Sequence, residues 1–377
     1  MAEYAIWLCD DVGRRIRPLD EFVTLDYVKV INGVGWFSLV YGEGIDPELF
    51  QVDSQVHVYR RPTYKDNMSL DFIGFLRAWN ASYRADTFLY TLSGPDQNDI
   101  LDRRIVAYAA GTASAQLSAV AADDGLKDIF NTNFIGGATD TARRLTSMGG
   151  GVTVQADATA GPTITKGYSW RNVLKTMLDI AEDARTQGTE IFFELAVNDV
   201  DEKTGLVSFE FRTAAGLPGR DLTSGGGLPP VIFGTEFGNV SEFDMMYDYR
   251  DERNDVYAGG QGEGAKRYIA QAEDNGRIFA SAWNRRELFV DARNEETTTA
   301  VDGIADAKLA EYRPQIRFEA RILDTQQARY GIDWALGDKV TIRELGDTFN
   351  GLVRRVHVKA SSNGQEDINV KVLSEDV

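Results

Sequence analysis

Three sequence elements occur in the same order near both ends of the 377-residue chain. They are an aspartate followed by an alternating strand, then a strand that contains a glycine, then a closing strand. The first set is Asp53–Arg60, Phe72–Trp79 and Thr87–Ser93, and the second set is Asp338–Arg343, Phe349–Val356 and Ile368–Ser374. Elements that recur in order indicate a duplicated unit. The sequence therefore predicts two related barrels, in which a glycine within a strand suits a bulge or a bend at a barrel corner.

The first hundred residues are typical of short β-strands. Aromatic and β-branched residues gather in five segments, Val28–Val30, Trp36–Tyr41, Gln55–Arg60, Ser69–Trp79 and Thr87–Leu92. Turn-forming pairs such as Asn32-Gly33 and Gly94-Pro95 separate these segments. This spacing predicts a compact barrel or sandwich.

Helical periodicity appears in the middle of the chain. Apolar residues within Leu126–Phe134 predict a short helix. A longer stripe over Trp170–Ala181 predicts a second helix, with Ser169 as its cap and Gly188 at its end. A hairpin is expected to pack on that helix, formed by Glu190–Val197 and Leu206–Thr213. A third helix is expected between the caps Thr297–Thr299 and Pro314.

These patterns predict an α+β, mainly β chain with two related antiparallel β-barrel domains and an inserted α+β region. Residues 1–100 form the first tube-like barrel and residues 101–228 the insertion. Residues 229–315 form a β-rich segment with a helix, which belongs partly to the insertion and partly to the second barrel. Residues 316–377 form the second tube-like barrel. The run Gly225–Pro230 is the best candidate for a linker.

The charge of the chain argues against DNA recognition. Asp and Glu number 58 against 40 Lys and Arg, which gives a net charge of −18. Such a surface repels the phosphate backbone that most nucleic-acid-binding proteins neutralise. The single cysteine, Cys9, excludes an intrachain disulfide and a cysteine-based zinc site. No segment approaches the ~20 apolar residues of a membrane span, so we expect a soluble chain without stable membrane insertion.

The sequence predicts no catalytic, cofactor-binding or metal-binding residues. The two histidines, His57 and His357, fall within predicted strands, and no HExxH, GxSxG or Walker A pattern occurs. Three pairs of adjacent carboxylates could serve glycoside hydrolysis, although a chain with 58 acids is expected to have such pairs: Asp123-Asp124, Asp251-Glu252 and Glu295-Glu296. The tryptophans are expected to pack in the core: Trp7, Trp36, Trp79, Trp170, Trp283 and Trp334.

Six segments of the chain together carry a family resemblance: Gly35-Trp36-Phe37, Asp53–Arg61, Asp71–Phe75, Leu101–Val106, Ala122–Ile129 and, in the second barrel, Leu336–Ile342. With these segments the chain resembles the tail-hub proteins of long-tailed phages and related archaeal viruses. This resemblance implies a structural virion protein without enzymatic activity, made in the host cytoplasm and located at the tail tip or baseplate. It also implies a homotrimer whose two barrels per chain form a pseudo-sixfold ring that matches a sixfold tail tube.

The resemblance further implies a set of partners: the distal tail protein, the tail tube protein, tail fibre or tip proteins and the tape measure protein. DNA would pass through the lumen without sequence-specific binding. We hypothesise that carboxylates line this channel and repel passing DNA, whereas a neutral or basic wall would favour a role in solubility. A carbohydrate- or receptor-binding tail protein and, less favoured, a tail-associated hydrolase of cell walls or glycans are the alternatives.

Overall fold

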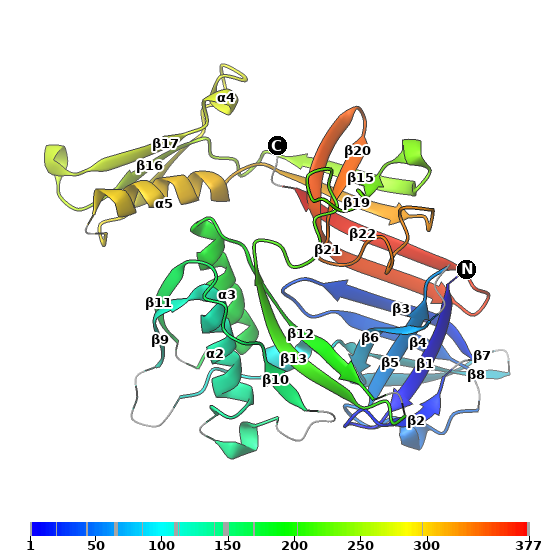
Figure 1. The fold of residues 1–377 in the computed structure, drawn as a ribbon. Coiled ribbons are helices and arrows are strands. Elements are labelled where there is room, and N and C mark those ends of the chain that lie inside the picture. Colours follow the sequence, from blue (N-terminus) through cyan, green and yellow to red (C-terminus); the bar gives the residue numbers. More distant parts are fainter. Residues whose placement is uncertain are drawn as a thin grey trace.

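The computed structural model describes residues 2–374 except 20, 43, 64–66, 85, 109–111, 113, 139, 146–150, 169, 202 and 296. Antiparallel sheets dominate and a few helices accompany them, so the predicted α+β, mainly β class is confirmed. Two layers of sheet carry the N- and C-terminal strands, and two smaller α+β parts project from them (Figure 1).

The largest sheet has ten strands and joins both ends of the chain. Its order is β15-β19-β22-β21-β3-β4-β8-β7, with β20 paired to β21 and β14 paired to β20. Its N-terminal strands are β3 (Phe22–Val30), β4 (Trp36–Tyr41), β7 (Ala78–Arg84) and β8 (Thr87–Pro95). The other strands are β14 (Ile232–Phe233), β15 (Val240–Asp248), β19 (Gln315–Ile322), β20 (Lys339–Glu344), β21 (Asp347–Ser361) and β22 (Glu366–Ser374).

A second, four-stranded sheet comes from the N-terminal region alone. Its order is β2 (Arg15–Pro18), β1 (Glu3–Cys9), β5 (Gln55–Arg61) and β6 (Ser69–Phe75). Apolar side chains from both sheets share one core, which includes Ile6, Val58, Leu39, Phe318 and Val356. The alternation of apolar and polar residues along each strand places one face of the large sheet on this core and leaves the other face open.

Strand pairing among the described residues closes no barrel. The predicted barrels are instead open, because the first set of strands continues into the second through the pairing of β3 with β21. The predicted bends do occur. β6 ends at Phe75 and β7 resumes at Ala78, while β21 remains one strand with a bulge between Val353 and Arg355.

Residues 101–228 include a compact α+β part. Its strands are β9 (Ala115–Ala121), β10 (Val152–Val154), β11 (Thr163–Tyr168), β12 (Ile191–Val200) and β13 (Val207–Ala215), and its helices are α2 (Ala122–Phe134) and α3 (Val173–Thr186). The short α1 (Asp99–Asp102) precedes it. The predicted first helix and hairpin are confirmed. The second helix begins later than predicted because Asn172 caps it and Trp170 lies outside it; Ser169 is outside the described residues.

An outlying part consists of β16 (Asp255–Gly259), β17 (Ile269–Glu273), β18 (Glu287–Asp291), α4 (Asn275–Ile278) and α5 (Thr298–Glu311). Thr297 caps α5 as the sequence predicts, since its Oγ1 accepts from the Ala300 amide at 3.2 Å. Four 3-10 turns complete the described elements: Pro47–Leu49, Thr141–Arg143, Thr235–Phe237 and Gly264–Lys266.

One predicted break is wrong. β8 runs through Gly94-Pro95, because Gly94 lets two backbones approach closely; a Cβ there would lie 1.8 Å from the Phe75 carbonyl oxygen.

Candidate functional site

The two ends of the chain repeat one arrangement of strands. β3, β4, β5 and β8 correspond to β15, β19, β20 and β22, and the pair β6 and β7 corresponds to the single strand β21. The register supports this correspondence. Val56 lies opposite Gly74 in the N-terminal set of strands, and Val340 lies opposite Gly351 in the C-terminal set.

Irregularities in the strands also repeat. The pairing of β3 with β4 shifts between Phe22 and Thr24, and the pairing of β15 with β19 shifts between Val240 and Glu242. A bulge is a specific local feature, so its presence at corresponding places supports duplication beyond the shared topology. We call β3, β4, β5, β6, β7 and β8 the first unit, and β15, β19, β20, β21 and β22 the second unit.

The residue alignment of the first repeated element was wrong by one position. The Asp53 amide donates to the Leu76 carbonyl at 3.0 Å, and the Gly337 amide donates to the Val353 carbonyl at 2.9 Å. Asp53 therefore corresponds to Gly337 rather than to Asp338. A shift of one residue exchanges the two faces of a strand, so an alignment of Asp53 with Asp338 would place corresponding side chains on opposite faces.

The alignment of the third element was wrong as well. Leu92 lies opposite Trp79, and its counterpart Val370 lies opposite Val356. The sequence comparison had paired Leu92 with Leu373 instead. The second element, from Phe72 to Trp79, keeps the predicted alignment.

The junction between the units is an antiparallel pairing of β3 with the second half of β21. Thr24–Val30 lies opposite Arg355–Ser361 over seven residue pairs. On the open face of this junction, His357 Nε2 lies 2.5 Å from Asp26 Oδ1, and the Trp36 ring lies 5.8 Å from the His357 ring. The backbone pairing of β3 with β21 thus joins the two units edge to edge, and these side-chain contacts add to it.

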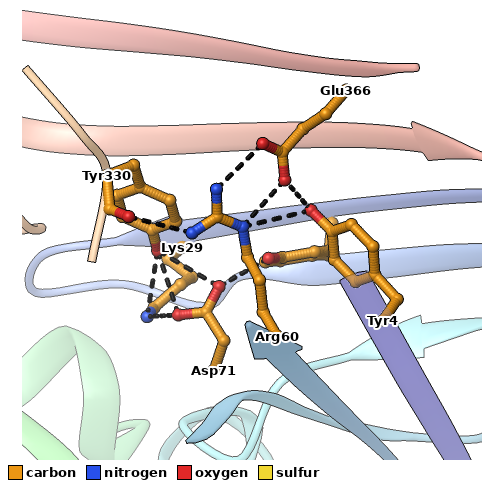
Figure 2. A network of polar contacts seen from close by, with 7 residues as sticks. Tyr4, Lys29, Arg60, Asp71, Tyr330 and Glu366 are labelled. Atoms are coloured by element: carbon orange, nitrogen blue, oxygen red, sulfur yellow. Dashed lines mark hydrogen bonds and ion pairs between the residues drawn. The ribbon is translucent and has the colours of Figure 1, made fainter. Parts of the chain in front are cut away.

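A buried ion pair reinforces the junction from the core side (Figure 2). The guanidinium of Arg60 on β5 donates to both carboxylate oxygens of Glu366 on β22, with each N···O distance 2.8 Å. Arg60 Nη1 also donates to the Tyr330 carbonyl at 2.9 Å, and the Tyr4 hydroxyl contacts Glu366. The Arg60 and Glu366 side chains are 2% and 10% exposed. The first unit is thus held to the second by a bidentate pair.

A second group of charges lies beside it and is partly buried, with the Lys29 and Asp71 side chains 28% and 16% exposed. Asp71 on β6 accepts from the ammonium of Lys29 at 2.9 Å and from the hydroxyls of Tyr27 and Tyr330 at 2.5 and 3.1 Å. Burial alone would lower the pKa of Lys29, but the Asp71 charge raises it above its ordinary value. Burial would raise the pKa of Asp71, and the Lys29 charge brings it below its ordinary value. Both groups are therefore charged at neutral pH.

Motifs and composition do not predict this network. A signal was present, because Arg60 follows Val56 and Val58 at the inward positions of an alternating strand. A charge at such a position indicates a buried partner. The partner is more than 300 residues away, and the sequence does not show where it lies.

Opposite charges alternate on the open face of the second unit. Lys371 Nζ lies 3.6 Å from Glu319, and Arg321 pairs with Glu242 at 3.7 Å and with Asp367. All of these residues except Asp367 border a groove of about 460 Å³. The face is consequently not a surface of unpaired carboxylates.

Asp96 follows β8 and connects the first unit to the insertion. Its Oδ1 accepts from the Asn98 amide at 2.9 Å, and Asn98 Oδ1 accepts from the Leu195 amide at 2.8 Å. Burial raises the pKa of Asp96 to about 7, although hydrogen bonds from the backbone of Gly35 and Asn98 lower it. The carboxyl is 4% exposed, so it is a structural link rather than an accessible acid.

The histidines have structural surroundings. His57 is fully buried, with Nε2 2.9 Å from Gln55 Oε1, and burial lowers its pKa to about 3. His357 faces Asp26 across the unit junction. Neither contact has the geometry of a nucleophile with its base.

The pairs of adjacent carboxylates do not form a common site. Asp123 and Asp124 both contact the buried ammonium of Lys127, at 3.0 and 3.3 Å. Glu252 is buried beside Arg277, while Glu296 is outside the described residues.

No group of three His, Cys, Asp or Glu side chains able to hold a metal occurs in the part of the chain that the structure describes. Cys9 is buried, and within the described ranges no helix is long and apolar enough to cross a membrane.

The prediction that the tryptophans pack in the core is wrong for four of six. Trp334 is fully buried and Trp7 is half-buried. Trp36, Trp79, Trp170 and Trp283 are 42%, 46%, 54% and 92% exposed. Trp79 lies on the edge strand β7, and Trp283 belongs to the outlying part, as does Phe279, which is 79% exposed. Aromatic residues on a surface commonly mark an interaction site.

Comparison with known proteins gives one family match. The model of the siphovirus ReqiPepy6 Gp37-like protein family matches residues 5–372. No curated protein matches the chain.

Three solved structures share the fold. A tail protein from Neisseria meningitidis MC58 is 13% identical with a TM-score of 0.60, and the alignment covers 99% of this chain and 97% of that one. The 43 kDa tail protein of prophage MuSo2 from Shewanella oneidensis is 12% identical with a TM-score of 0.62, covering 100% and 99%. Prophage tail protein gp18 from Listeria monocytogenes EGD-e is 10% identical with a TM-score of 0.53, covering 98% and 94%.

Proposed function

The chain belongs to the siphovirus ReqiPepy6 Gp37-like family of phage tail and baseplate structural proteins, and on that premise we propose that it is a tail hub. In this role it joins a sixfold tail tube to a threefold tail tip. It forms part of the channel through which DNA leaves the virion. The function requires assembly and no catalytic turnover.

The observation that carries this proposal is the edge-to-edge junction of two equivalent units in one sheet. A junction that joins two copies of a unit within one chain can in principle be repeated between chains. Three chains then present six units around one axis, and the mismatch between threefold and sixfold symmetry is resolved. The distal tail protein and the tail tube protein would bind the sixfold side, and tail fibre or tip proteins would bind the threefold side. The tape measure protein would end at the same ring.

In such a ring the open face of the ten-stranded sheet lines the channel. The other face carries the core, and the two smaller α+β parts lie outside the sheet layers (Figure 1). The mixed, paired charges of the open face do not support an acidic channel wall. The net charge of −18 then acts mainly on solubility, through acids located elsewhere on the surface.

The test is the mass and symmetry of the assembled protein. Light scattering on the full chain, alone and with the distal tail and tail tube proteins of the same phage, is expected to give a trimer. Averaged electron images are expected to show six similar lobes around a channel. A chain that stays monomeric with both partners would refute the hub role.

One observation favours a second function, the binding of a carbohydrate receptor. Phe279 and Trp283 are 79% and 92% exposed on the outlying part, and exposed aromatic rings are surfaces on which sugar rings stack. Glycan arrays with the full chain test this function. Binding that is lost in Trp283→Ala and kept in Trp170→Ala would support it.

A further inference from the structure

The ten-stranded sheet ends in two edge strands that correspond to the two strands of the junction. β7 at one end corresponds to the second half of β21, and β15 at the other end corresponds to β3. Among the described residues, β7 pairs only with β8 and β15 pairs only with β19. Each strand therefore leaves one row of backbone donors and acceptors unpaired by another strand, which is a template for a further strand.

Both edge strands also carry aromatic residues, on the face of the sheet that covers the core. Trp79 and Tyr83 on β7 are 46% and 59% exposed, and the Trp79 ring lies 5.6 Å from Phe50 of the core. Phe243 and Tyr247 on β15 are partly buried against the same core. All four side chains lie on the core side of the sheet, since residues two apart share a face.

We propose that β7 of one chain pairs antiparallel with β15 of a second copy, in the register that β21 and β3 already show within the chain. This inference rests on the proposed hub function and specifies its inter-chain contact. Within the chain, Val356 lies opposite Lys29, Val358 opposite Tyr27 and Ala360 opposite Leu25.

Transferred to the edge strands, this register places Trp79 opposite Tyr247, Ala81 opposite Met245, and Tyr83 opposite Phe243. Two aromatic pairs thus form at the contact, and such cross-strand pairs stabilise a sheet. On the open face, Asn80 takes the place of His357 and Asp244 takes the place of Asp26. The Asn80 amide then donates to the Asp244 carboxylate, as His357 contacts Asp26 in the junction.

This contact differs from that of a dimer with a twofold axis. It joins two different edges, so it is heterologous, and it closes only as a ring. Ring closure leaves neither β7 nor β15 as a free edge, which removes a hazard that otherwise leads to aggregation.

Disulfide cross-linking tests the register. Directly opposite residues in antiparallel strands have Cα atoms about 4.5–5.5 Å apart, within the range that a disulfide spans. Full-length chains with Asn80→Cys, mixed with chains with Met246→Cys under mild oxidation, are expected to give a covalent dimer. A chain with both substitutions is expected to give a covalent trimer. The parent chain is the negative control and is expected to form no cross-link, because its one cysteine, Cys9, is buried.

A shifted pair is the matched control. Asn80→Cys mixed with Met245→Cys is expected not to cross-link, because residues 80 and 245 would lie on opposite faces. A trimer in which the shifted pair links, or in which the Asn80 and Met246 positions stay unlinked, overturns the register and leaves the hub function intact. A monomer in the presence of tail partners overturns both.

The aromatic contacts have a separate test. The double variant Trp79→Ala, Tyr83→Ser is expected to weaken assembly roughly tenfold or more, while the circular dichroism spectrum of the monomer stays unchanged. Trp283→Ala, which removes an exposed tryptophan that belongs to neither edge strand, is expected to leave assembly unchanged. Equal assembly of the double variant and the parent chain would exclude these aromatic contacts.

Discussion

Asp53 and Gly337 occupy the same place in the two units, with φ angles of +65° and +88°. The Asp53 amide donates to the Leu76 carbonyl, and the Gly337 amide donates to the carbonyl of the corresponding residue, Val353. The left-handed region favours glycine and tolerates Asp and Asn, so the two units meet one backbone requirement with different residues.

This equivalence predicts the tolerance of position 337. Gly337→Asn is expected to cost under about 1 kcal/mol of unfolding free energy, and Gly337→Val about 2 kcal/mol or more, because a β-branched residue resists positive φ. A Cβ there lies 3.3 Å from Pro218 Cγ, a neighbour that both variants meet equally. Chemical denaturation measures the difference. Equal costs for the two variants would mean that crowding rather than backbone strain governs the position.

The corresponding glycines Gly74 and Gly351 are expected to resist even a methyl group. A Cβ would lie 2.2 Å from Phe37 Cδ1 in the first case and 2.5 Å from Val372 Cγ1 in the second. Overpacking at such sites costs about 1–3 kcal/mol, so Ala at either position is expected to lower the midpoint of urea unfolding. Gly42→Ala, where a Cβ meets nothing within 4 Å, is the control and is expected to be nearly neutral. An unchanged urea midpoint for Gly351→Ala would contradict this close packing.

The buried pair of Arg60 and Glu366 is expected to be sensitive to the loss of one partner. Glu366→Gln leaves a buried guanidinium without its counter-charge, which typically costs about 3–5 kcal/mol. The double variant Arg60→Met, Glu366→Leu is expected to cost less than Glu366→Gln alone, because no uncompensated charge remains. Unfolding free energies of the single and double variants give the comparison. Additive losses would show that the two side chains do not interact as a pair.

Asp96 gives a prediction about pH. Its pKa is about 7 in the folded chain and near its ordinary value of about 4 in the unfolded chain. As pH rises from about 4 to about 7, the unfolded chain loses the proton first, so stability that is complete below pH 4 declines until pH 7.

Asp96→Asn keeps the neutral form at every pH. We expect its stability advantage over the parent chain to grow between pH 4 and pH 7, toward an upper limit of about 4 kcal/mol. His57, whose pKa is lowered to about 3, contributes the opposite slope in both proteins, so it cancels in the difference. Thermal unfolding at several pH values measures this difference. An advantage that stays constant with pH would contradict the raised pKa of Asp96.

The sequence predicts the duplicated elements and the helices α2 and α5 because their apolar spacing and caps are local signals. It does not predict β1, which has no distinct turn before it and depends on pairing with β5. The register of the repeat was missed at Asp53 because two aspartates resemble each other in sequence but differ in role. Asp338 accepts from the Arg220 amide at 2.7 Å, whereas Asp53 contacts Arg77 and Arg103.

Most of the other features that the sequence does not predict depend on contacts between segments far apart in the chain. Arg60 and Glu366 are separated by 306 residues, so neither periodicity nor composition identifies their pairing. Trp79 was assigned to the core by residue type alone, since the sequence does not show that β7 is the last strand of its sheet. Burial depends on what lies beside a strand, and this is a property of topology.

The junction of β3 with β21 is made largely of backbone hydrogen bonds, which place few demands on side-chain identity. Mutations can therefore accumulate along both strands while the spacing and direction of the contact persist.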